Sequence, residues 1–308
     1  MKKIAAKLNK RIQKDKVRKI HKLDEIKASK EAAEEALSTV KSTEELIAKG
    51  HTPVASAYHH AQNLLSVIVE SLLLYPELSR FSQILEDAED LYMPGWPPMS
   101  PVSDSFFYTW GSFDLAVGLQ KESLVSIICE LSHLFKLPTS LIDVFRLFEH
   151  SKMSVYEYEG FQEGHCLLRE LHTNKQFIAL NESGYTGKLG ELWYVRLLPD
   201  ISRGEKGALC YTSPYVITES VESWYAFIHR QSWKRDKKSM DYDSLLKSGV
   251  TPAYWLEYVT QAYSGVDSNN GAIFLKGFPD QGHTRPHADI DSSGTRLLDH
   301  QALVHCIE

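Results

Sequence analysis

The 308-residue chain has little cysteine, and the cysteine that it has is scattered. Its four cysteines form no C-x-x-C pair and match no zinc-ligand spacing. Cys129 lies in an apolar helical pattern, whereas Cys166 and Cys210 lie in strand patterns and Cys306 is near the end. The pattern predicts buried free thiols in a reducing compartment, so we expect a cytoplasmic protein rather than a disulfide-bonded secreted one.

Long apolar runs are also missing. No window approaches 18 apolar residues, and the longest run, around 64–75, is interrupted by Ser66, Glu70 and Ser71. The basic start is not followed by the apolar region and small-residue cleavage site of a secretory signal. We therefore expect an intracellular protein without a transmembrane segment.

Familiar catalytic motifs are absent from the sequence. It contains no G-x-S-x-G, and no cysteine lies in a context that would activate it. The segment Gly184–Gly190 (GYTGKLG) resembles a phosphate-binding loop but lacks the G-K-[ST] ending, and it lies between two strand patterns. These features favour a hairpin loop there, and they leave open whether the protein is an enzyme.

Charged residues are distributed unevenly along the sequence. Residues 1–30 carry twelve Lys or Arg against three acidic residues, a net charge of +9. Because the whole chain carries −6, the remaining residues must carry −15. Such a basic segment can contact nucleic acid phosphates or an acidic protein surface. The residues that we predict to make this contact are Lys7, Lys10, Arg11, Lys14, Arg18 and Lys19.

The same segment has the composition of a helix, since residues 2–48 contain neither proline nor glycine. Its apolar residues, beginning with Ile4, Leu8 and Ile12, recur at three- and four-residue intervals as a narrow stripe. This pattern is typical of a coiled-coil-like arm or of a helix lying across a partner. We therefore predict self-association or a protein partner through residues 1–48, with nucleic acid as an alternative ligand.

Punctuation by proline and glycine divides the chain into four predicted parts. These are a basic helical arm at 1–50, an α-helical domain at 51–150, a small β unit with a following helix at 151–232, and a helical and irregular segment at 233–308. A helix is expected to begin at Thr52-Pro53, where threonine caps and proline takes the first helical position.

The α-helical domain contains a proline-rich junction at 93–101, which predicts a stiff extended crossing. A helix capped by Ser103 or Asp104 and running to about 118 should follow it. On that helix Phe106, Trp110 and Phe113 would share one buried face, and Asp114 would cap or pair beside it.

Short alternating segments between 154 and 217 predict about five strands separated by turn residues. They indicate a small antiparallel sheet or barrel of SH3-like or OB-like size, flanked by helices, so the predicted fold class is α+β. Its aromatic residues fit either a small core or exposed stacking platforms for bases. These are Tyr156, Tyr158, Trp193 and Tyr194.

Four short pieces between 106 and 218 carry a resemblance to known proteins: FYTWGSFD at 107–114, HSKMSVYEYE at 150–159, LRELHTN at 168–174 and GELWYVRLLP at 190–199. In this order they resemble uncharacterised bacterial proteins that often end in a SEC-C zinc-binding tail. The resemblance implies a helical stretch followed by a small β unit with a tight hairpin. The C-x-C and C-[HC] ligands of the tail are missing here, so its zinc role is not implied.

Two groups of side chains have the donor types of a divalent metal site. One is the C-terminal run with His283, His287, Asp289 and Asp291, in which Pro286 prevents a regular helix. The other is the pair His59 and His60 on the helix after Thr52.

Two functional hypotheses follow. The first is a non-enzymatic interaction or regulatory protein that contacts a partner or nucleic acid through its basic arm and needs no cofactor. The alternative is a metal-dependent hydrolase that uses histidine and carboxylate side chains.

Overall fold

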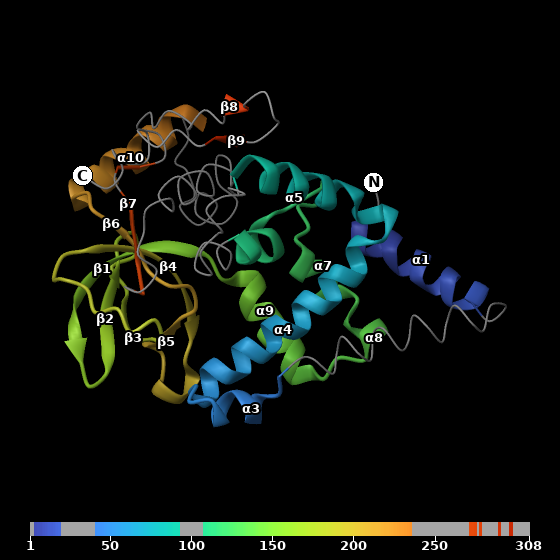
Figure 1. Ribbon diagram of the computed structural model, residues 1–308, viewed down its shortest axis with the longest axis horizontal. Helices are drawn as coiled ribbons and strands as arrows, with labels where there is room; N and C mark the ends of the chain where they lie inside the picture. The colour runs from blue at the N-terminus through green and yellow to red at the C-terminus, as the bar shows by residue number, and fades with distance from the viewer. Residues whose placement is uncertain are drawn as a thin grey trace. The chain divides into compact units, whose positions relative to one another are not determined.

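The structure is a computed structural model that describes residues 3–19, 41–92, 107–235, 271–275, 277–278, 289–290 and 296–297 (Figure 1). Helices make up the part before residue 151 and strands dominate the part after it, which confirms the α+β class. The chain divides into two compact units, a helical one from 1–86 and 111–150 and a β-rich one from 87–110 and 151–308. No helix in the described ranges is both long enough and apolar enough to cross a bilayer.

The helical elements before residue 151 are, in chain order, α1 (Ile4–Lys19), α3 (Thr43–Ala48), α4 (Pro53–Leu73), η1 (Pro76–Leu78), α5 (Ser79–Tyr92), η2 (Trp110–Asp114), α7 (Leu124–Glu130), α8 (Ser132–Phe135) and α9 (Thr139–His150). Within the helical unit α4 packs against both α7 and α9, and α1 packs against α7 and η1 (Figure 1). The core of this unit is therefore shared by helices that are distant in sequence.

The central helix α4 begins where the sequence predicts. The hydroxyl of Thr52 accepts a hydrogen bond from the backbone N–H of Ala55 at 3.3 Å, and Pro53 occupies the first helical position. Leu65 and Leu72 are buried on its inner side. Near its start the ring of Tyr58 lies 6.0 Å, between centroids, from that of Phe148 on α9. The prediction of this cap is confirmed.

The aromatic segment after the junction forms a π-helical turn, η2, instead of the regular helix predicted to continue to about 118. The reason lies at Gly111, where an added Cβ would be only 2.7 Å from the Cδ2 atom of Leu85 on α5. The wider turn lets the backbone approach α5 this closely and brings Phe113 onto Phe148, with stacked ring centroids 4.7 Å apart. Residues 93–101 and Phe106, also part of the predicted junction, lie outside the described residues.

The β-rich unit is built around a closed five-stranded barrel. Its elements are β1 (Met153–Gln162), β2 (His165–Glu170), β3 (Gln176–Asn181), β4 (Leu192–Pro199), η3 (Ile201–Arg203), β5 (Gly207–Cys210), β6 (Tyr215–Ile217), α10 (Val221–Arg235), β7 (Ile273–Leu275), β8 (Asp289–Ile290) and β9 (Arg296–Leu297). The hydrogen-bonded order is β1-β2-β3-β5-β4, and β4 pairs again with β1 (Figure 1). With β3 and β5 parallel, this is the strand order of an OB-type barrel.

Closure depends on a bend in β1. The first half of β1 pairs with β4 and the second half with β2, and the register with β2 shifts by one residue between Tyr158 and Gly160. Gly160 has a φ of 140°, a conformation that a residue with a Cβ rarely adopts. The bulge therefore turns β1 from one neighbour to the other, as bulges do at barrel corners.

Side chains that point into the barrel form one apolar core. Its buried members are Tyr156, Tyr158, Cys166, Leu168, Ala179, Trp193, Val195, Ala208, Cys210, Val216 and Ala272. Tyr158 stacks on Trp193 with centroids 4.9 Å apart. Of the two interpretations of these aromatic residues, the structure thus favours the core, because Tyr156, Tyr158, Trp193 and Tyr194 are all buried.

Two expectations about the β unit were wrong. The sheet is mixed rather than antiparallel, since β3 pairs in parallel with β5 and β6 with β7. The segment Gly184–Gly190 is not a hairpin loop, because the strands that it joins, β3 and β4, are not neighbours in the sheet. Alternation of residues reveals a strand but not its partner, so both errors concern pairing.

We expect Phe113→Ala to lower the free energy of unfolding by about 3–5 kcal/mol, because a fully buried ring stacked on Phe148 is removed. Urea unfolding of the full chain, followed by far-UV circular dichroism, measures this change. The matched control is Leu119→Ala, which truncates a largely exposed leucine and should change the value by about 0.5 kcal/mol or less. Equal values for the two variants would contradict the packing described for η2.

Candidate functional site

The basic helix α1 is docked on the helical unit by its apolar stripe. Ala5, Leu8 and Ile12, spaced at three and four residues, are all buried, and α1 contacts α7 and η1. At its start Gly118 approaches Ile4 closely, since an added Cβ there would be 3.2 Å from the Cδ1 atom of Ile4. The apolar residues that we predicted to contact a partner are thus buried, between Ala5 and Ile12, within the helical unit itself.

A buried carboxylate holds the N-terminus of α1. The side chain of Glu122 accepts hydrogen bonds from the backbone N–H groups of Ile4 at 2.7 Å and Ala5 at 3.1 Å. Only 6% of Glu122 is exposed. Its negative charge also interacts favourably with the helix dipole, whose positive end is at the N-terminus. Glu122 therefore satisfies two N–H groups of α1 that have no partner within the helix.

The face of α1 opposite the docked stripe is basic. Its exposed residues, which we call the basic face, are Lys3, Lys7, Lys10, Arg11 and Lys14. Lys3, Lys7, Lys10 and Lys14 follow one another at intervals of four, three and four residues, so they share one side of the helix. Arg11 pairs with Asp15 at 3.3 Å, and Lys3 pairs with Glu130 at 2.5 Å. The hydrogen bond to Glu130, with its charge, raises the pKa of Lys3.

The structure thus places Lys7, Lys10, Arg11 and Lys14, four of the six predicted binding residues, on one exposed surface. The other two, Arg18 and Lys19, belong to the last turn of α1, and the structure describes their backbone only. Sequence reasoning found the basic residues but missed Glu122. That residue lies 118 positions from Ile4, and no local pattern links the two segments.

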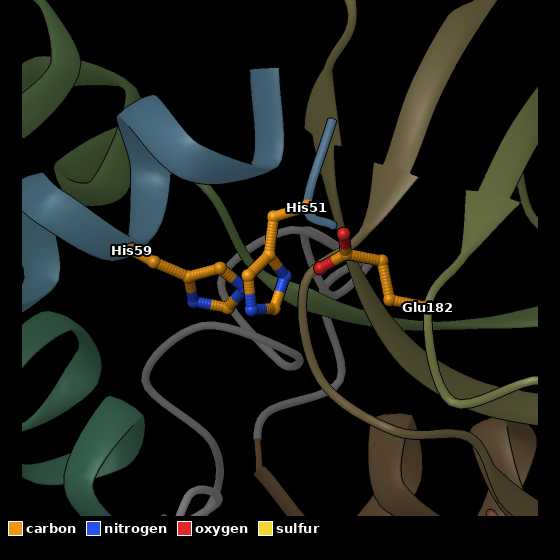
Figure 2. Close-up of side chains that lie close together, drawn as sticks. All are labelled: His51, His59 and Glu182. Atoms are coloured by element: carbon orange, nitrogen blue, oxygen red, sulfur yellow. The ribbon is translucent and has the colours of Figure 1, made fainter. Parts of the chain in front are cut away.

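The predicted metal pair on α4 does not converge. The Nδ1 atom of His60 lies 2.9 Å from the backbone carbonyl oxygen of Lys41. The ring of His59 instead faces His51, with centroids 5.2 Å apart (Figure 2). Consecutive helical residues point about 100° apart, which explains the divergence. Glu182, also drawn in Figure 2, belongs to the β-rich unit. Sequence reasoning missed His51, whose only signal is its position just before the capping Thr52.

The C-terminal metal candidates cannot be placed in the same way. His283, His287 and Asp291 lie outside the described residues, and for Asp289 the structure describes only the backbone, in β8. The metal site predicted for this run therefore stays a prediction.

The outer face of β1 and β2 presents paired charges. Arg169 on β2 forms ion pairs with Glu157, its direct neighbour across the strands, and with Glu159 at 2.7 Å. Gln176 on β3 donates to the other oxygen of Glu159 at 3.1 Å. In OB-type barrels the face of the second and third strands is the usual surface for oligonucleotides. Here its arginine is engaged by two carboxylates, which disfavours phosphate binding.

Described cysteines lack the character of nucleophiles. Burial raises the pKa of the Cys129 thiol to about 12 and that of Cys166 to about 11, and it raises the pKa of Cys210 as well. A thiol must lose its proton to attack, so these three remain neutral and unreactive near neutral pH. Among the described residues, cysteine therefore supplies no activated nucleophile.

We expect Glu122→Ala to loosen α1, because the N–H groups of Ile4 and Ala5 lose their acceptor. The cost should be about 1–2 kcal/mol, comparable to the loss of a helix cap. Hydrogen exchange followed by mass spectrometry should show faster exchange of the amides of 4–15 than in the unchanged protein. The control Glu130→Ala removes only the exposed pair with Lys3 and should leave that exchange unchanged. Unaltered exchange in Glu122→Ala would contradict the docking role.

We also expect Cys129 and Cys166 to alkylate at least about tenfold more slowly in the native protein at pH 8 than in urea, because their raised pKa values leave almost no thiolate. Brief treatment with iodoacetamide followed by peptide mass spectrometry reads each cysteine separately. Rapid native labelling of either one would show an accessible thiolate and would revive a nucleophilic function.

Comparison of the chain with protein-family models, with curated proteins and with solved structures finds no match. The resemblance of residues 106–218 to bacterial proteins with SEC-C tails stays a prediction. Functional inference therefore has to start from the geometry of the chain itself.

Proposed function

We propose that this is a non-enzymatic interaction protein that binds nucleic acid phosphates through the basic face of α1. The observation that supports this proposal is that α1 has a buried apolar face and, on its opposite side, an exposed basic face. Ala5, Leu8 and Ile12 are buried, and the basic residues therefore project away from the unit. Docking fixes the backbone of the helix, so only the side chains have to be ordered when a ligand binds.

Docking also argues against the coiled-coil interpretation of this segment. Two helices associate as a coiled coil by burying apolar stripes against each other. The stripe of α1 between Ala5 and Ile12 is already buried inside the helical unit. What α1 offers to a partner is therefore charge, which favours a polyanion over a second apolar helix.

Nucleic acid suits this surface better than a single anion does. Cations on successive turns of a helix are about 5 Å apart along its axis, so the basic face presents a row of charges that several phosphates of one strand can contact together. Asp15, which pairs with Arg11, is the only acidic residue within α1. Since the rest of the chain is acidic, attraction of phosphates should be confined to this part of the protein.

The buried free thiols Cys166 and Cys210 fit the same proposal, because reduced cysteine is typical of the cytoplasm, where nucleic acids are also available. The alternative of a metal-dependent hydrolase gains no support from the predicted pair His59 and His60, because the two rings turn to different neighbours.

We expect the triple variant Lys7→Glu, Lys10→Glu, Lys14→Glu to abolish binding of a fluorescein-labelled DNA duplex measured by fluorescence anisotropy. In the unchanged protein the logarithm of affinity should fall linearly with the logarithm of salt concentration. Each lost phosphate contact lowers the slope by about 0.9, so single Lys→Ala variants at these positions should each lower it by about 1.

A matched control reverses three exposed lysines of the β-rich unit, Lys175→Glu, Lys188→Glu and Lys206→Glu. This variant has the same net charge as the first, and we expect it to retain at least half of the affinity. An equal loss of DNA affinity in the two triple variants would show that only net charge matters, and it would overturn the assignment of binding to α1. Tighter binding of polyglutamate than of DNA or single-stranded RNA would identify an acidic protein as the partner instead.

A further inference from the structure

Two imidazole rings, those of His51 and His59, lie close together at the start of α4 and take no part in the function proposed for α1. We propose that His51 and His59 chelate one divalent transition-metal ion of the zinc class, with water completing its coordination. The inference does not depend on nucleic acid binding, because both residues are distant in sequence from α1 and act through different chemistry.

The separation of the rings is that of a chelating pair. Two Zn–N bonds of about 2.0–2.1 Å at a tetrahedral angle put the nitrogens about 3.4 Å apart and the ring centroids about 5.2–5.4 Å apart. The centroids of His51 and His59 are 5.2 Å apart, with ring planes inclined at 62°. One ring nitrogen of His51 lies within 4.8 Å of one ring nitrogen of His59. A modest rotation of the rings therefore brings both nitrogens to bonding distance.

The backbone around His51 holds it near this position. Its N–H donates to the carbonyl oxygen of Leu46 at 3.3 Å, which ties it to the end of α3. The next residue, Thr52, caps α4, and Pro53 fixes the first helical φ. His51 thus precedes the helix in a place that its backbone defines.

The second ligand, His59, belongs to the long helix α4. It lies on the second turn of α4, a 21-residue helix whose inner side is buried. Both imidazoles are partly buried rather than fully exposed, which limits the number of rotamers that metal binding must exclude. One ligand is therefore held on a helix, and the other is held by the backbone that leads into it.

The chemistry of the pair selects the ion. Imidazole nitrogen suits Zn²⁺, Cu²⁺ and Ni²⁺, whereas Mg²⁺ and Ca²⁺ prefer oxygen ligands. Since affinity for a nitrogen site rises toward Cu²⁺, this ion is the most sensitive probe, and Zn²⁺ tests the proposed class. Ca²⁺ should not compete with either.

The experiment uses the full chain, purified without a histidine tag and treated with a chelator. Zn²⁺ binding is measured by isothermal titration calorimetry, and one equivalent of Cu²⁺ is examined by electron paramagnetic resonance, which counts bound nitrogens. We expect one site with two imidazole nitrogens. His51→Ala and His59→Ala should each weaken Zn²⁺ binding at least about tenfold and remove one nitrogen from the Cu²⁺ spectrum.

Two controls make the result specific. His60→Ala removes the neighbouring imidazole, whose Nδ1 atom is 2.9 Å from the carbonyl oxygen of Lys41, and should leave affinity within twofold. A variant with His283, His287, His300 and His305 all replaced by Ala removes the four C-terminal imidazoles and should also retain the site. Loss of binding in either control, or unchanged binding in His51→Ala or His59→Ala, would overturn the proposal. Circular dichroism of each variant separates lost ligation from lost folding, and His51→Gln and His59→Gln replace any alanine variant that unfolds.

Discussion

The bond between the Glu122 carboxylate and the first N–H groups of α1 is the interaction on which the functional surface depends. It fixes where α1 begins and, together with the buried Leu8, which side of the helix faces inward. A helix with a narrow apolar stripe and many cations would otherwise be marginal alone in water. Docking therefore turns a charged sequence into a surface with defined positions.

Docking exposes charged side chains on α1, whereas closure of the barrel buries strand edges and aromatic side chains in the β-rich unit. Pairing of β4 with both β1 and β5 leaves no edge among the five barrel strands, and the large aromatic rings fill the interior. On the outer face Arg169 pairs with Glu157 and Glu159, and Gln176 donates a hydrogen bond to Glu159. The interior of the barrel is therefore filled, and the arginine on this outer face is already engaged by two carboxylates.

Local chemistry made part of this fold predictable. Thr52-Pro53 marks the start of α4, and alternation of residues between 154 and 217 revealed the strands, although β5 and β6 were read as one continuous strand over 208–217. Which strands pair with each other was not predictable. Neither the parallel pairing of β3 with β5 nor the pairing of β4 with β1 is indicated by the sequence of either strand alone. The turn at η2 was missed for the same reason, since it depends on how closely Gly111 approaches Leu85. The basic residues were visible as composition, whereas Glu122 and the facing of His51 toward His59 required tertiary contacts.

The 118 positions between Ile4 and Glu122 also have a consequence for synthesis on the ribosome. At about 5–20 residues per second, α1 emerges roughly 6–24 s before the carboxylate that will hold it. Throughout that interval α7, one of the two elements against which α1 docks, has not been made, so the docking surface for the apolar stripe is incomplete. A nascent chain therefore exposes the basic face of α1 before the carboxylate that holds this helix has been made.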